Sequence, residues 1–308
     1  MELINYTMPP FTRMQWASKK IKEKYEPLFT EAQKYFPFLE RESVKHGLRH
    51  ATTSHVSHDE MDTFQQQLNR DGLVFLPIQK VGHYNGSSSY HPEVVEGKPW
   101  SYYGVIADSI EHAEQFAHAS DVGDHTTLGR LLGYPECCIN MLNNVWMKGY
   151  YDPVWQQAQN TDSKYLKLEQ EKLMHFKDIP WELNNLYRSF GVGPFFHVRC
   201  SLDCEHTLKM SREWIKLGEK LNAPGLKELE LFLRMPVEWD ALKGISYLRN
   251  PLFKASTNSV MCIEQHRVRL DGTYYPLDAP RSLDYPWTET IATLAKNENK
   301  LTYGGDKL

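Results

Sequence analysis

Apolar residues recur at helical spacing over most of the first 235 residues. Met61, Phe64 and Leu68 share one face of a predicted helix, because residues three and four apart lie on the same side of a helix. Residues 57–60 before it have the form of a capping box, and Gly72 ends it. The same reasoning predicts further helices from about Trp16 to near Pro37, Ser109 to Ala119, Leu128 to Leu132, Pro135 to about Lys148, Ser201 to just before Pro224, and Leu226 to Leu233.

Short apolar runs between these helices predict strands at Leu73–Ile78, Trp100–Ala107 and Phe195–Val198. After residue 235 the pattern becomes β-rich. The predicted elements there are strands at Phe253–Thr257, Val260–Ile263 and His266–Leu270, and a hairpin turn at Asp271-Gly272. The pattern favours an α+β fold, with a mixed α/β arrangement as the alternative. We expect a helix-rich domain with a short sheet over 1–235 and a smaller β-rich segment over 236–308 packed against it.

Asp108 lies between the strand Trp100–Ala107 and the helix that follows it. Open α/β sheets bind ligands at the carboxyl ends of their strands, which makes Asp108 a candidate for acid–base chemistry. Asp108 and Ser109 are also good N-cap residues. Capping is the simpler interpretation, and catalysis is the alternative.

The composition describes an ordinary globular protein. Of 308 residues, 41% are hydrophobic and 24% are charged, and the net charge of -4 provides no basic field for nucleic acid. The first six residues lack the features of a signal peptide, and no apolar run is long enough for a membrane span. Five cysteines make a poor disulfide framework. We therefore expect a cytoplasmic protein whose cysteines are thiols or metal ligands.

The first of two cysteine-bearing windows spans residues 133–138, Gly-Tyr-Pro-Glu-Cys-Cys. Gly133 ends one predicted helix and Pro135 occupies the first position of the next, so Cys137 and Cys138 lie in its first turn. Cys138 shares helical spacing with the apolar residues that follow it and should face the core. The positive end of a helix favours a thiolate, so this window offers sulfur ligands.

The second window spans residues 197–206. Cys200 precedes a predicted helix with Ser201 as its N-cap, and Cys204 lies on that helix. If the two helix starts face each other, their sulfurs converge on one metal ion or cluster. The predicted ligands are Cys137, Cys138, Cys200 and Cys204, with His197 and His206 able to replace a sulfur.

Two arginines lie near these windows in sequence. Arg199 could neutralise the charge of a cluster, and Arg130 could orient an anionic substrate. His197 is a candidate proton carrier as well as a ligand. These residues, with Asp108, form the predicted site.

Zinc and an iron–sulfur cluster both use such ligands. Adjacent cysteines reach one tetrahedral ion with difficulty, whereas the irons of a cluster are spread over several ångströms, so the spacing favours a cluster. A 4Fe–4S cluster with three cysteine ligands would keep one iron open to a substrate. A metal-free thiol pair and buried structural cysteines are the alternatives. Cys262, alone in a predicted strand, should belong to the core.

Four histidines lie within thirteen residues: His46, His50, His55 and His58. His46 and His50 would share a face if a helix continued through them. Gly47 weakens such a helix, and a zinc site needs ligands held in a fixed geometry. We interpret this stretch as a polar surface segment.

Leu132-Gly133-Tyr134-Pro135-Glu136-Cys137-Cys138, followed by His197-x2-Cys200-x3-Cys204, resembles the signature of an uncharacterised family of microbial proteins. The likeness covers about residues 125–220, and it is weaker over 236–239 and the β-rich segment. The resemblance implies that the two windows act together. It implies no mechanism.

The leading hypothesis is a metal- or iron–sulfur-dependent cytoplasmic enzyme that acts on a small molecule. A non-catalytic binding or adaptor protein, in which zinc joins the two helix starts, is the alternative. A nucleic-acid modification protein is a further alternative, against which the net charge argues.

Overall fold

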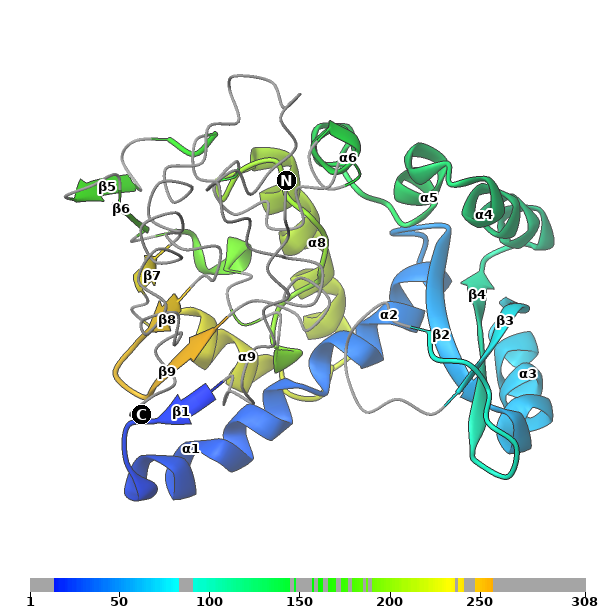
Figure 1. Cartoon of the computed structure of the whole chain (residues 1–308), viewed down its shortest axis with the longest axis horizontal. Coiled ribbons are helices and arrows are strands. Elements are labelled where there is room, and N and C mark those ends of the chain that lie inside the picture. The colour runs from blue at the N-terminus through cyan, green and yellow to red at the C-terminus, as the bar shows by residue number, and fades with distance from the viewer. Residues whose placement is uncertain are drawn as a thin grey trace, which may run out of the picture.

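The structure is a computed structural model that describes part of the chain. The described residues are 14–82, 91–144, 147, 157, 160–162, 166–169, 173–176, 179–184, 187, 190–235, 238–240 and 247–256. Within them the fold is α+β, as the sequence predicts. A small antiparallel sheet and its helices lie beside a larger helical body that carries a second sheet (Figure 1). In this described part, no helix has the length and apolar character that crossing a membrane requires.

The small sheet consists of β2 (Ala51–Ser57), β4 (Trp100–Ala107) and β3 (Val74–Gly82), in that spatial order. Both pairings are antiparallel, and Ala107 lies opposite Ala51 on one side and Val74 on the other. The strands predicted at 73–78 and 100–107 are thus confirmed. Because both neighbours of β4 run antiparallel to it, the rule for ligand binding in open α/β sheets gives no support to a catalytic role for Asp108.

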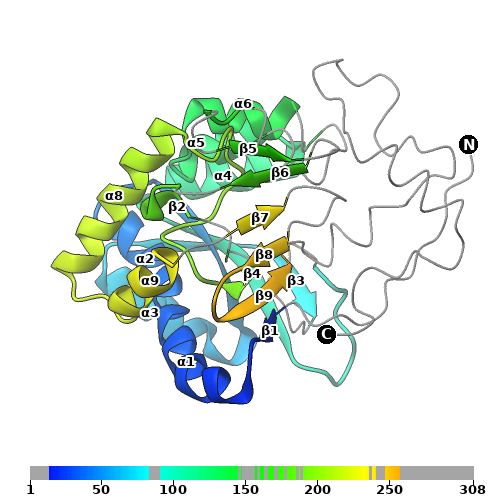
Figure 2. The same cartoon turned by 90° about the vertical axis from the view of Figure 1, so that its left-hand side faces the viewer.

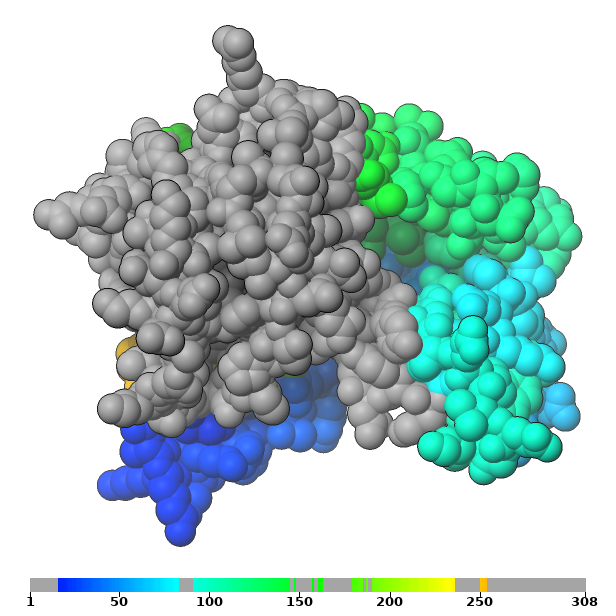
Figure 3. All heavy atoms as spheres, viewed as in Figure 1, coloured from blue at the N-terminus to red at the C-terminus, as the bar shows by residue number. Residues whose placement is uncertain are grey.

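Successive residues of a strand point to opposite sides of a sheet. Both sides of this sheet are apolar, and helices cover both. The end of α2 (Tyr35–Lys45) and α3 (Met61–Arg70) pack on one face, and α4 (Ile110–Val122) and α5 (His125–Leu131) pack on the other. The first core contains Val44, Val56, Leu68, Leu73, Phe75 and Ile106; the second contains Ala51, Val105, Ala107, Ala113, Phe116 and Leu131. Figure 3 shows the cyan sheet segment and the green helices side by side on the surface.

The larger body contains α1 (Lys19–Ala32), α8 (Glu205–Lys220) and α9 (Leu226–Leu233), which Figure 2 shows from the side. Phe29 lies in its core, with ring centroids 4.9 Å from Phe232 and 5.8 Å from Phe253 in edge-on contacts. α2 also contributes Tyr35 and Leu39 to this core. Since α2 packs against both units, it connects them.

The second sheet combines strands from both ends of the described chain. Its order is β1 (Met14–Trp16), β9 (Phe253–Ser256), β8 (Tyr247–Arg249), β7 (Glu238–Asp240), β6 (Leu173–Phe176) and β5 (Leu166–Glu169). The strand predicted at 253–257 is confirmed as β9, and the domain boundary at 235 stays a prediction. The other elements predicted after residue 257, and Cys262, lie outside the described residues.

Several boundaries in the first seventy residues differ from the prediction. Trp16 belongs to β1 and not to a helix, and Pro37 lies in the first turn of α2, where its missing N–H costs nothing. Ser57 makes no capping hydrogen bond, since one turn of 3-10 helix, η1 (His58–Glu60), comes before α3. Gly72 ends α3 with φ of +72°, as expected.

Around the cysteine windows, α6 spans Glu136–Asn144, and the end predicted at about Lys148 lies outside the described residues. Residues 195–198 form no strand. The N-cap of α8 is Cys204 and not Ser201, because residues 202 and 203 form a turn before the helix begins. The helices predicted from Ser109 and from Leu226 are confirmed as α4 and α9.

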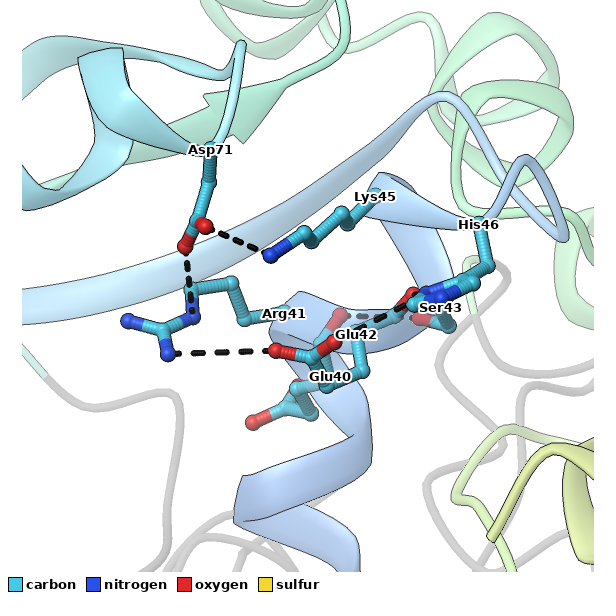
Figure 4. A network of polar contacts seen from close by, with 7 residues as sticks. All are labelled: Glu40, Arg41, Glu42, Ser43, Lys45, His46 and Asp71. Atoms are coloured by element: carbon cyan, nitrogen blue, oxygen red, sulfur yellow. Dashed lines mark hydrogen bonds and ion pairs between the residues drawn. The ribbon is translucent and has the colours of Figure 1, made fainter. Parts of the chain in front are cut away.

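Polar contacts fasten the exposed side of α2 to the turn after α3 (Figure 4). Asp71 accepts a 2.5 Å hydrogen bond from Lys45 and lies 3.9 Å from Arg41. The hydrogen bond from Lys45 holds the pKa of Asp71 below its usual range. These groups are partly exposed, so each pair contributes little to stability.

Arg49, just beyond α2, is buried and also makes polar contacts with this helix. Its guanidinium donates to Ser43 Oγ at 2.8 Å and lies 3.7 Å from the Glu40 carboxylate. It also lies 4.8 Å from the ring centroid of Trp214 on α8. Burial lowers the pKa of Arg49, and the charge of Glu40 opposes that shift. One buried cation thus connects α2 to α8.

Replacing Arg49 should therefore destabilise the protein strongly. We expect Arg49→Met to lower the free energy of unfolding by at least about 3 kcal/mol, because Glu40 loses its charged partner. Arg41→Met is the matched control on the exposed side and should cost less than about 1 kcal/mol. Urea denaturation of both variants measures the difference, and equal losses would contradict a special role for the buried cation.

Candidate metal centre

The four cysteine sulfurs of the two windows converge. Cys137 Sγ lies 3.7 Å from Cys204 Sγ, and Cys138 Sγ lies 3.9 Å from both. Together with Cys200 Sγ, these atoms all lie within 4.8 Å of one another. Cys138 and Cys204 are buried, while Cys137 and Cys200 are half-buried. The arrangement is compatible with metal binding, since thiolates are preferred ligands of zinc and iron.

The first window is held by a tight turn between α5 and α6. Gly133 has φ of +74°, and Tyr134 N donates to Gly129 O at 2.8 Å. A Cβ atom on Gly129 would lie 2.7 Å from Ile139, so the absence of a side chain lets α6 approach α5 closely. Pro135 precedes α6, and Cys138 N bonds its carbonyl. Both cysteines therefore lie in the first turn, as predicted.

Adjacent cysteines reach a common point without backbone strain. Their sulfurs lie 3.9 Å apart on the regular backbone of α6. Among the described residues other than glycine, only Asn222 has a positive φ. The geometric objection to binding one ion, which the sequence raises, does not apply to this structure.

The residues of the second window that precede α8 form no helix or strand, and side chains from several places fix them. Tyr134 Oη donates to Phe196 O at 3.1 Å, and burial raises the pKa of this tyrosine to about 12, which keeps the hydroxyl protonated. Leu202 N donates to Thr161 Oγ1 at 3.0 Å, and Asn160 Nδ2 donates to Cys200 O at 2.9 Å. These bonds hold Cys200 and Cys204 against α6.

The thiols of Cys138 and Cys204 have pKa values shifted in opposite directions. Hydrogen bonds from Cys138 and Cys200 lower the pKa of Cys204, although burial opposes the shift. Hydrogen bonds with Cys200 and Cys204, together with burial, raise the pKa of Cys138. Cys204 is thus the first of the three to carry negative charge, and its neighbours stabilise that charge.

A polar chain leads from the sulfurs to His197. Thr207 Oγ1 lies 3.4 Å from Cys138 Sγ and 3.2 Å from His197 Nε2. The imidazole is buried and lies against the rings of Tyr134 and Phe195, with centroids 5.1 and 4.9 Å away. His197 thus contacts the sulfur group through Thr207, and it lies outside the group of converging ligand atoms.

The other predicted residues are dispersed. His206 is exposed in the first turn of α8 and lies outside the converging group. Arg130 is exposed and pairs with Glu136 at 2.6 and 3.2 Å. Arg199 is fully buried, donates to Leu183 O and lies over the ring of Phe195. The structure brings the four sulfurs together, and the roles predicted for Arg130 and Arg199 stay predictions.

Asp108 takes part in a separate group. Its carboxylate contacts His50 Nδ1 at 2.8 Å and His112 Nδ1 at 2.5 Å. Ser109 caps α4 by accepting a hydrogen bond from His112 N, so the capping role of Asp108 is not seen. The sequence analysis does not predict this group, because it interprets His50 as part of a polar surface segment and assigns no role to His112. The spacing of Asp108 and His112, one helical turn, was the available clue.

Comparison of the chain with protein-family models, with curated proteins and with solved structures finds no match. The geometry of the site therefore carries the functional argument by itself.

The turn that places Cys137 and Cys138 can be tested at Gly133. A Cβ there would lie 3.0 Å from Arg49 Cβ and 3.2 Å from Leu48 O, in addition to the strain of the positive φ. Gly123 ends α4 with φ of +71° and has open space around it. We expect Gly123→Ala to cost about 1 kcal/mol and Gly133→Ala about 1–3 kcal/mol more, because of overpacking. Urea denaturation measures both, and equal costs would show that the close approach is unimportant.

Proposed function

We propose that the four cysteines bind a single tetrahedral zinc ion, which joins the start of α6 to the start of α8. The protein is then a zinc-stabilised protein in which the metal has a structural role. The observation that carries this proposal is the spacing of the sulfurs, 3.7–3.9 Å for the pairs among Cys137, Cys138 and Cys204.

The spacing suits one ion better than a cluster. Two sulfurs bound at 2.3 Å to a tetrahedral ion lie about 3.8 Å apart. The cysteines of a 4Fe–4S cluster bind different irons, so their sulfurs would have to separate well beyond the 4.8 Å limit seen here. A single ion therefore needs little movement of the chain.

A set of four cysteines also favours a structural role. Structural zinc sites fill all four positions with protein ligands, whereas catalytic sites keep one position for water or substrate. The ion would connect two helix starts whose sulfurs come from segments more than sixty residues apart in sequence. It would also neutralise thiolates at a place where two of the four side chains are buried.

A cluster-dependent enzyme acting on a small molecule is the second candidate. The observation in its favour is the partial exposure of Cys137 and Cys200, which leaves one side of the group open to solvent. If one of these two cysteines is not a ligand, one iron of a 4Fe–4S cluster would be free to bind a substrate. Cytoplasmic location fits both candidates and is itself a prediction.

Metal analysis of the purified chain separates the two. We expect about one zinc per chain, with no acid-labile sulfide and no visible absorption, because the ligand set and spacing suit zinc. Iron and sulfide in matching amounts would replace the structural-zinc proposal with the cluster. A protein that contains no metal when purified anaerobically, and that takes up neither zinc nor iron, would contradict both.

The fifth cysteine provides a matched control for the ligands. Cys138→Ser and Cys204→Ser should lose zinc and lower the midpoint of thermal unfolding, because a buried thiolate ligand is removed. Cys262→Ser should keep the zinc content of the unmodified chain, since the four converging sulfurs already fill every position of a tetrahedral ion. Zinc loss in the Cys262 variant would show that the ligand set is wrong.

Thr207 tests the surroundings of the proposed ion. Its hydroxyl contacts Cys138 Sγ and His197 Nε2, and groups that bond metal ligands usually affect metal affinity by 10- to 100-fold. We expect Thr207→Val to weaken zinc binding by about 10-fold or more, measured by competition with a chelator. Thr207→Ser keeps the hydroxyl and should bind zinc nearly as the unmodified chain does. Equal affinities of the Val and Ser variants would exclude a role for the hydroxyl.

A further inference from the structure

His50, Asp108 and His112 form a second group of potential metal ligands, separate from the cysteines. One ligand atom from each residue lies within 4.8 Å of the other two. The carboxylate lies between the two imidazoles, and the ring centroids of His50 and His112 are 4.2 Å apart. Among the described residues, the cysteine group and this one are the two that bring three or more such atoms together.

The backbone holds the three residues in place. Asp108 N donates to His50 O at 3.1 Å, which extends the pairing of Ala51 with Ala107 by one step. His50 N donates to Leu131 O at 3.0 Å, at the end of α5. His112 lies in the first turn of α4, where its N–H bonds Ser109 Oγ. The ligand atoms therefore come from the ends of two strands and one helix, and not from a long loop.

Because Ser109 is the N-cap of α4, the Asp108 carboxylate does not cap the helix and contacts the two histidines instead. Its two oxygens each face one Nδ1 atom, at 2.8 Å from His50 and 2.5 Å from His112. The carboxylate thus lies between two potential nitrogen ligands.

Two imidazoles and one carboxylate are a recognised ligand set for zinc and iron(II). Ligands bound to such an ion at about 2.1 Å lie roughly 3.0–3.4 Å apart, so the imidazoles need to move away from the carboxylate by less than about 1 Å. The side chains are 56%, 31% and 33% exposed for His50, Asp108 and His112, which leaves room for that movement. Three protein ligands and solvent access leave coordination positions open, unlike the closed set of four cysteines.

We propose that His50, Asp108 and His112 bind a divalent transition metal ion of the zinc and iron(II) class, with positions left for water or a small ligand. The site is independent of the proposed zinc ion at the cysteines. It belongs to the chemical class of open nitrogen and oxygen sites, in which a bound ion can polarise a ligand or activate water.

Cobalt(II) is a suitable probe, because its absorption distinguishes thiolate ligands from nitrogen and oxygen ligands. The full chain, as purified, is titrated with Co²⁺ and followed by calorimetry and absorption. We expect one equivalent to bind with weak d–d bands and without thiolate-to-cobalt charge transfer. If the cysteines lack metal, they bind a separate equivalent that does show charge transfer, so the two proposals fail or succeed separately.

Three histidine variants locate the ion. His50→Gln and His112→Gln should each lose the equivalent that lacks charge transfer. His118→Gln, an exposed histidine on the same helix α4, should bind Co²⁺ as the unmodified chain does. Circular dichroism confirms that the variants are folded, which their exposed positions favour. The proposal is overturned if the unmodified chain shows no such equivalent, if both folded variants retain it, or if His118→Gln loses it equally; in that outcome the group is a hydrogen-bonded clamp only.

Discussion

The contact between the turn at residues 48–50 and the turn at residues 131–133 fixes chain segments that lead to both groups of candidate ligands. His50 N bonds Leu131 O, and Gly133 lies so close to Arg49 that a Cβ atom would approach to 3.0 Å. From this contact one chain segment continues into β2, and the other continues into the turn of α6. His50 of the histidine group belongs to this contact, and Cys137 and Cys138 of the cysteine group follow shortly after Gly133. A change in this packing would therefore shift the histidine group and the cysteine group together.

The two groups differ in how their charge is compensated. The cysteine group brings several thiols into a partly buried place, where one thiolate is stabilised by its neighbours and further ionisation needs a cation. The histidine group sets one carboxylate between two imidazoles near the surface, so it is stable with or without an ion. A metal would consequently be a part of the fold at the first group and a reversible ligand at the second.

Much of the cysteine group could be predicted from sequence because it depends on local signals. Gly133 and Pro135 fix the turn, and the positions of Cys137 and Cys138 follow from it. The second window is predicted less well: Cys204 and not Ser201 is the N-cap of α8, and tertiary hydrogen bonds involving Tyr134 and Thr161 hold the preceding residues outside the helix. The histidine group could be predicted only in part, because Asp108 and His112 are one helical turn apart but His50 reaches them through the antiparallel register of β2 and β4. Nothing in a single sequence gives that register.

The second sheet has a consequence for the order in which the chain folds. β1 at residues 14–16 pairs with β9 at residues 253–256, more than two hundred residues later. The small sheet with α2 to α5 uses only residues 35–131 and can form while the rest of the chain is still being synthesised. The cysteine group needs the chain up to residue 204, and β1 finds its partner only after β9 has been made. Pairing across such a separation is slow, so the edge of β1 is the last part of the described fold to be protected, and a chaperone would act there longest.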